Sequence, residues 1–134
     1  VRETEEFIYR MQTLFVLENL DNLRKNGRLT RLQAVVTGAL KIKLFMGATK
    51  EGEICKLGQA LSIKQALSKM TDYIAQDLDH EGRVCAICHC NNPRRAQMVK
   101  EMLEERCRFQ KFEMLEAGGV TTVYANDGGI VVSY

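Results

Sequence analysis

The sequence predicts an α+β fold, a two-layer sandwich in which helices pack on a mixed β-sheet. Segments with the spacing of amphipathic helices alternate with short runs of apolar and β-branched residues, an order typical of helices packed on a sheet. Two of the short runs are separated by Lys50-Glu51-Gly52, which indicates a hairpin and therefore an antiparallel strand pair. With 134 residues the chain is long enough for one domain, residues 1–134, with its own core.

The N-terminal part of the chain predicts a short helix over about 3–11, a strand over 13–17, a helix over 19–25 and an apolar helix over 31–42. Asn26-Gly27 ends the second helix, because these residues readily adopt the left-handed conformation of a helix cap. The capping box Thr30-Arg31-Leu32-Gln33 begins the third. Its apolar stripe has helical spacing and consists of Leu32, Val35, Val36, Ala39 and Leu40.

The rest of the chain alternates strands and helices. The hairpin strands are expected at 44–49 and 53–57, and further strands at 83–90, 111–115 and 130–134. Ser62-Ile63-Lys64-Gln65 is a second capping box, and Asn92-Pro93 supplies an N-cap followed by proline at the first helical position. Gly118-Gly119 and Gly128-Gly129 are expected to form tight turns. The inward residues of the two helices are expected to be Ile63, Ala66, Leu67, Met70, Tyr73, Ile74 and Leu78, and Ala96, Val99, Leu103 and Cys107.

Composition excludes several classes of protein. The formal net charge of +2 and the scattered basic residues do not indicate a nucleic-acid-binding protein. The chain has no apolar run of about 18 residues, so no membrane span is expected. The N-terminal residues lack the pattern of a signal peptide, and the five cysteines are an odd number that favours a reducing, cytoplasmic location over a disulfide framework.

Cys85, Cys88, His89 and Cys90 contain the residue types that bind zinc. Side chains alternate along a strand, however, so Cys85 and His89 are expected on one face and Cys88 and Cys90 on the other. We therefore expect no metal site, and we expect His89 to be a structural residue of the turn. No catalytic set of residues emerges, so the sequence indicates a protein that is not an enzyme and needs no cofactor.

Arg28 and Arg31 flank the start of the apolar helix. The unpaired N–H groups of a helix N-terminus and a nearby guanidinium both favour an anion. This location, next to apolar surface, suits the carboxylate or phosphate group of an amphipathic ligand. The alternative is that both arginines are ordinary surface charges that contribute little.

Four segments of the chain, in order, resemble the DegV family of bacterial fatty-acid-binding proteins. They are Leu20–Leu29, which resembles a Leu-x-x-Leu-(Arg/Lys)-Lys-Gly-Gly-Arg element; Leu40–Leu44; Glu51–Ile54; and Ile87–Pro93, which resembles Ile-Ser-His-Ala-Asp-Asn-Pro. The resemblance runs from about residue 10 to the end. It implies the C-terminal domain of a two-domain protein, and nothing in the chain resembles the family's N-terminal α/β domain.

The resemblance also implies a function. The family holds one long-chain fatty acid between its two domains, and some members present its carboxylate to a fatty acid kinase. Arg28 would lie near the carboxylate and Arg31 on the surface used by the kinase. The family's head-group histidine corresponds to Ala125 here, so Asn126 would offer a substitute hydrogen bond. The tunnel-wall candidates, which could equally be plain core, are Leu29, Leu32, Val35 and Val36.

The rival hypothesis is an interaction or scaffold domain without a small ligand, whose arginines dock on an acidic protein surface. Under the first hypothesis the partners are a long-chain fatty acid, a fatty acid kinase and the N-terminal domain. Fatty acid that co-purifies with the protein would favour the first hypothesis, and lipid-free protein the second.

Overall fold

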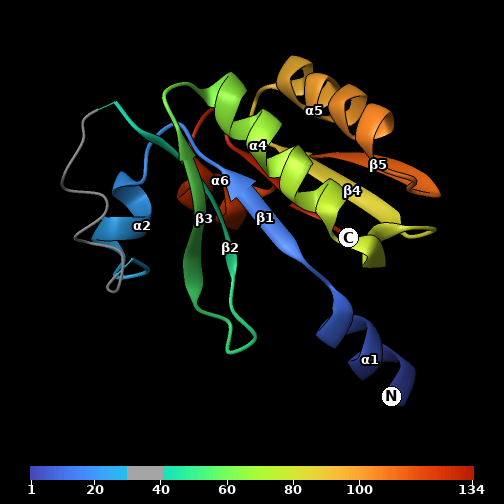
Figure 1. Cartoon of the computed structure of the whole chain (residues 1–134). Helices are drawn as coiled ribbons and strands as arrows, with labels where there is room; N and C mark the ends of the chain where they lie inside the picture. The colour runs from blue at the N-terminus through green and yellow to red at the C-terminus, as the bar shows by residue number, and fades with distance from the viewer. Residues whose placement is uncertain (30–40) are drawn as a thin grey trace.

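The computed structural model describes residues 1–29 and 41–134, and within them six strands form one mixed sheet (Figure 1). The strand order is β3-β2-β1-β6-β4-β5. β4 and β5 run parallel, and every other neighbouring pair is antiparallel. The strands are β1 (Thr13–Val16), β2 (Lys43–Ala48), β3 (Ile54–Ala60), β4 (Val84–His89), β5 (Lys111–Glu116) and β6 (Ile130–Ser133).

Two long helices, α4 and α5, lie side by side on one face of the sheet (Figure 1). The predicted α+β fold with helices packed on a mixed sheet is thereby confirmed. α2 and α6 contact each other at one end of the sheet, and α1 extends from the opposite end. The helices are α1 (Arg2–Arg10), α2 (Asp21–Lys25), α4 (Ile63–Gln76), the 3₁₀ turn η1 (Leu78–His80), α5 (Pro93–Arg106) and α6 (Gly119–Ala125).

The predicted start signals of α4 and α5 are confirmed. The Ser62 hydroxyl accepts a hydrogen bond from the Gln65 N–H at 3.2 Å, and the Asn92 side chain accepts one from the Arg95 N–H at 3.0 Å. The prediction that Tyr73 and Leu78 lie inward is wrong, because Tyr73 is 43% exposed. α4 ends at Gln76, and Leu78 begins the following 3₁₀ turn with 82% of its surface exposed.

Two further expectations concern residues 31–42 and the segment that begins at Gly118. The predicted helix over 31–42, with Arg31, Leu32, Val35 and Val36, falls on residues 30–40, outside the described residues, and Lys41 and Ile42 are not helical. Gly118-Gly119 predicts only a tight turn, whereas in the structure Gly119 begins the helix α6. Packing of Ala125 and Tyr124 against neighbouring elements accounts for its helical conformation.

The larger hydrophobic cluster lies between the sheet and the helices α4 and α5. β1 and β6 direct alternate residues into it, among them Leu14 and Val132, and α4 and α5 bury Ala66, Leu67 and Leu103 there. Burial of apolar surface of this extent is the main source of stability of the sandwich. This cluster occupies only one face of the sheet.

Candidate functional site

The other face of the sheet carries a row of paired residues that crosses every strand. Residues directly opposite each other in neighbouring strands share a face. We call this row the open face, and its members, from β3 to β5, are Lys56, Met46, Phe15, Val131, Cys88 and Leu115. All but the terminal lysine are apolar.

The open face is less covered than the face beneath α4 and α5. Val132, which points toward the helices, is completely buried, whereas its neighbour Val131 on the open face is only partly buried. Phe15 and Cys88 are also partly exposed and Leu115 is 52% exposed, whereas Met46 of the same row is completely buried. A contiguous apolar surface of this kind in a folded protein usually marks a binding site.

One end of the open face merges with a second hydrophobic cluster. Phe15 and Ile54 pack against this cluster, which lies where β1 and β4 end and α2 and α6 meet. Its buried members are Leu17, Leu23, Leu29, Cys90 and Ala125. Leu29 retains only 2% exposure, so in this structure it is a core residue of the second cluster.

Arg28 is placed by the end of α2. Gly27 has φ of 69°, its N–H donates to the Arg24 carbonyl at 3.1 Å, and the Arg28 N–H donates to the Leu23 carbonyl at 2.9 Å. This is a Schellman cap, which the Asn26-Gly27 pair predicted. The side chain of Arg28 is exposed, and no carboxylate within residues 1–29 and 41–134 forms an ion pair with it. In the chain Arg28 directly precedes Leu29, which belongs to the second cluster.

Asn126 joins α6 to α2 through its amide group. Its Nδ2 donates to Asn19 Oδ1 at 2.9 Å, and its Oδ1 accepts from Asn22 Nδ2 at 2.8 Å. Asn22 Nδ2 also donates to the Val123 carbonyl at 2.6 Å. An amide has two N–H donors and two oxygen lone pairs, so Asn126 keeps one N–H and one lone pair for a ligand. The neighbouring Ala125, where the resemblance implied a histidine in the family, is buried and offers no polar side-chain atom.

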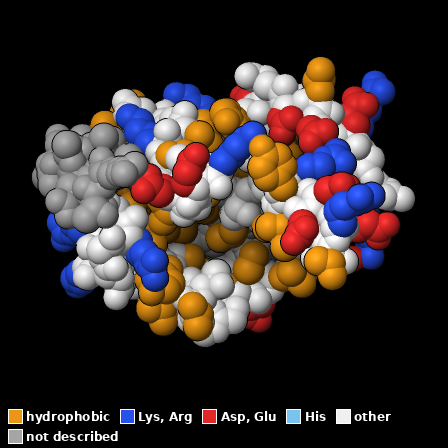
Figure 2. All heavy atoms as spheres, turned by 90° about the horizontal axis from the view of Figure 1, so that it is seen from below, with side chains coloured by type: hydrophobic (Ala, Val, Ile, Leu, Met, Phe, Trp, Pro, Cys, Tyr) orange, Lys and Arg blue, Asp and Glu red, His pale blue; other side chains and the backbone are white. Residues whose placement is uncertain are grey.

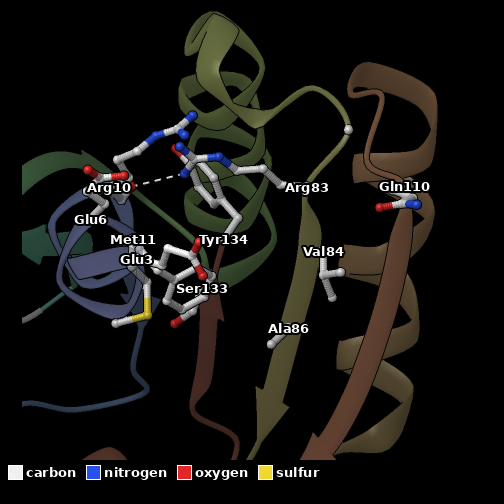
Figure 3. Close-up of a pocket in the computed structure, with 12 residues that line it drawn as sticks. Glu3, Glu6, Arg10, Met11, Arg83, Val84, Ala86, Gln110, Ser133 and Tyr134 are labelled. Atoms are coloured by element: carbon white, nitrogen blue, oxygen red, sulfur yellow. Dashed lines mark hydrogen bonds between the residues drawn. The ribbon is translucent and has the colours of Figure 1, made fainter. Parts of the chain in front are cut away.

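Two of the described pockets lie at the other end of the open face, beside α1, and a third lies along α5. The first has a volume of about 520 Å³ and is lined mainly by apolar surface. Figure 3 shows Val84 and Ala86 of β4 across from Met11. The Arg83 guanidinium donates to the Arg10 carbonyl at 3.0 Å at the rim (Figure 3). Figure 2 shows hydrophobic side chains gathered around a hollow on this side of the molecule. Neither this pocket nor the second one, beside the β2–β3 hairpin, includes Arg28, Leu29 or Asn126.

α1 itself has no buried residue, although its sequence is amphipathic. Phe7, Ile8 and Tyr9 are each at least 60% exposed. The helix is tethered by the Arg83 contact and by Lys50 Nζ, which donates to the Tyr9 hydroxyl at 2.9 Å. A helix whose apolar side chains remain this exposed has surface available for a partner.

The cysteine-rich strand behaves as alternation predicts. Cys85 is buried under the helices, and His89 pairs with Ile130 on that same face, whereas Cys88 lies on the open face. Burial raises the pKa of Cys85 to about 12 and also raises the pKa of Cys88 and of Cys90. The Asn92 N–H lies 3.4 Å from His89 Nδ1, in keeping with a structural histidine of the turn. In the described part of the chain, no group of three or more His, Cys, Asp or Glu residues is arranged to hold a metal ion.

The whole chain, residues 1–134, matches the family described as "Uncharacterised protein, DegV family". A DegV domain-containing protein from Streptococcus pyogenes is 29% identical over 134 residues, which are 100% of this chain and 48% of that protein. The chain therefore spans about half the length of such curated relatives.

Solved structures are similar as well. A DegV-family protein from Ruminococcus gnavus, whose structure holds vaccenic acid, is 45% identical with a TM-score of 0.93, over 99% of this chain and 48% of that one. The fatty acid kinase B3 protein of Streptococcus pneumoniae, loaded with linoleic acid, is 28% identical with a TM-score of 0.81, over 99% of this chain and 48% of that one.

Proposed function

The chain belongs to the DegV family, and on this premise we propose that it is the C-terminal domain of a two-domain protein that binds a long-chain fatty acid. The observation that carries the proposal is the apolar open face, which is continuous with the second cluster and partly exposed. Burial of an acyl chain contributes about 0.8 kcal/mol per methylene, so such a surface binds the chain tightly without any chemistry. The vaccenic acid in the relative that is 45% identical supports this ligand class.

The carboxylate, under this proposal, is held near the end of α2. The guanidinium of Arg28, which follows the Schellman cap of α2, donates hydrogen bonds to this carboxylate. Asn126 donates the remaining N–H of its side-chain amide to the same group. Leu29 contributes to the apolar wall beneath them. Leu32, Val35 and Val36 complete the wall, and Arg31 faces a fatty acid kinase, although these four lie outside the described residues. The domain acts by holding and presenting the ligand, and it is not a catalyst.

The open face and α1 are, in this proposal, covered by the N-terminal domain. The exposed Phe7, Ile8 and Tyr9 and the pocket of about 520 Å³ beside α1 support this arrangement, because together they form apolar surface next to the open face. The chain spans 48% of the relative that is most like it among the structures named above. We propose a cytoplasmic location. Among the described residues, no helix is both long and apolar enough to cross a bilayer.

The test compares the fatty-acid affinity of two variants of the full-length protein, each with one arginine of the Asp21–Leu29 segment replaced. Arg28→Gln should weaken binding of vaccenic acid by roughly 10- to 100-fold, because a charge-assisted hydrogen bond contributes about 1.5–3 kcal/mol. Arg24→Gln is the matched control, since Arg24 is exposed and pairs with Asp21 at 3.2 Å. Affinities are measured by displacement of a fluorescent fatty acid from delipidated protein.

Equal affinities of the two variants for vaccenic acid would show that Arg28 does not contact the ligand. Mass spectrometry of a lipid extract from the purified protein addresses the rival scaffold function. Protein that carries no fatty acid and takes none up in the displacement assay would refute the lipid proposal.

A further inference from the structure

The turn between α6 and β6 has a backbone conformation that needs support. Asn126 has φ of 58° and ψ of 173°, and Gly128 has φ of 81°. The first pair of angles lies at the edge of a region that glycine occupies almost alone, and such conformations persist only where the surrounding structure holds them. Asn126 is also the residue that carries the proposed polar contact to the ligand.

Several contacts hold this turn: the Gly128 N–H donates to the Cys90 carbonyl at 2.8 Å, the Cys90 N–H donates to the Gly129 carbonyl at 3.0 Å, and Asn91 Nδ2 donates to Asp127 Oδ1 at 2.8 Å. A further contact comes from α5. Arg95, in the first turn of α5, donates from Nη1 to the Gly128 carbonyl at 2.5 Å. From Nη2 it donates to Glu18 Oε1 at 2.7 Å. The Arg95 side chain is 19% exposed, so both contacts are largely shielded from water.

The two terminal nitrogens of Arg95 contact residues that lie close in sequence to the two partners of the Asn19–Asn126 hydrogen bond. Gly128 is two residues after Asn126, and Glu18 directly precedes Asn19, whose Oδ1 accepts the Asn126 hydrogen bond. Glu18 is itself fixed from the other side, because Lys43 Nζ donates to its carbonyl oxygen at 2.7 Å and lies 3.6 Å from its carboxylate. Arg95 therefore contacts the chain close to both partners of the Asn19–Asn126 hydrogen bond, at Gly128 and at Glu18.

We infer that Arg95 is a positioning residue of the head-group site: it keeps the Asn126 amide oriented toward the ligand carboxylate without contacting the ligand. This inference rests on the proposed function. A planar guanidinium is suited to the role because its fork geometry holds two acceptors at a fixed separation, which an ammonium group cannot do.

The test separates positioning from simple stabilisation by comparing vaccenic acid with its methyl ester, in the protein as its gene encodes it. Arg95→Gln should lower the affinity for the acid by roughly tenfold, as expected when a hydrogen bond to a charged group is lost, and leave the affinity for the ester nearly unchanged. Arg94→Gln, on the exposed side of the same helical turn, is the matched control and should change neither affinity. Arg95→Lys keeps the charge and one contact, so its acid-to-ester ratio should be intermediate.

The NMR signals of the Asn126 side-chain NH₂ group provide a readout independent of ligand. They should shift in Arg95→Gln and not in Arg94→Gln. An equal loss of affinity for acid and ester would mean that Arg95 only stabilises the fold, and an unchanged acid-to-ester ratio with unshifted NH₂ signals would also overturn the inference. If the unsubstituted protein binds neither compound, the proposed function is wrong. If it binds vaccenic acid but the Arg95 variants behave like the control, only the inference about Arg95 is wrong.

Discussion

The clearest prediction compares two adjacent valines of β6 that point to opposite faces of the sheet. Threonine has nearly the shape of valine and similar strand propensity, so Val→Thr replaces one methyl group by a hydroxyl and changes little else. Val132→Thr places the hydroxyl among fully buried apolar side chains, and Val131→Thr places it on the open face.

The two substitutions should lower the free energy of unfolding by different amounts. Val132 is 0% exposed, and a hydroxyl buried without a partner costs about 1–3 kcal/mol, so Val132→Thr should lower the free energy of unfolding by that amount. Val131 is partly exposed in the unliganded domain, where its hydroxyl reaches water, and the loss should stay within about 0.5 kcal/mol. Against an acyl chain the same hydroxyl is desolvated, which should weaken fatty-acid binding by roughly 5- to 30-fold, or about 1–2 kcal/mol.

Urea denaturation followed by far-ultraviolet circular dichroism gives the unfolding free energies, and displacement of a fluorescent fatty acid gives the affinities. The chain has no tryptophan, so intrinsic fluorescence is a poor alternative. Equal destabilisation by both substitutions would show that the open face is ordinary core. An unchanged affinity in Val131→Thr would show that the ligand does not touch it.

Further predictions concern the α6–β6 turn and the buried thiol. Asn126→Ala should destabilise the protein by about 1 kcal/mol more than Asn126→Gly, because glycine adopts these backbone angles with less strain than alanine, and urea midpoints of the two variants test this difference. Gly129→Ala should unfold at a clearly lower urea concentration than the unsubstituted protein, since an added Cβ would lie 2.6 Å from the Ala125 carbonyl oxygen. Burial raises the pKa of Cys85 from 9.0 to about 12, so the stability gained from its neutral thiol is present below pH 9 and is lost as the pH rises toward 12. Cys85→Ala should therefore flatten the fall in stability above pH 9 compared with Cys55→Ala, as urea midpoints measured from pH 8 to 11 would show; identical slopes would contradict the shift.

Local signals predicted many of the elements well. Ser62, Asn92 and Asn26-Gly27 each act through hydrogen bonds to residues within five positions, so the caps they predicted appear in the structure as expected. Alternation along β4 separated Cys85 from Cys88 for the same reason, because the direction of a strand side chain depends only on its own backbone. The error at Leu78 arose because periodicity carries no information about where α4 stops.

The sequence alone determined the class of the fold, the helix caps, the placement of Cys85 and Cys88 on opposite faces of a strand and the resemblance of the Leu20–Leu29 segment to a known family, since all of these are local patterns. Only the tertiary structure decided which face of the sheet is left partly exposed, that α6 is a helix, and that Leu29 packs with Leu17 and Leu23. It alone also brought Arg95, Glu18 and Asn126 together. The Arg95–Glu18 contact joins residues 77 positions apart and the Asn126–Asn19 contact joins residues 107 positions apart, and no pattern within a short stretch of chain specifies them.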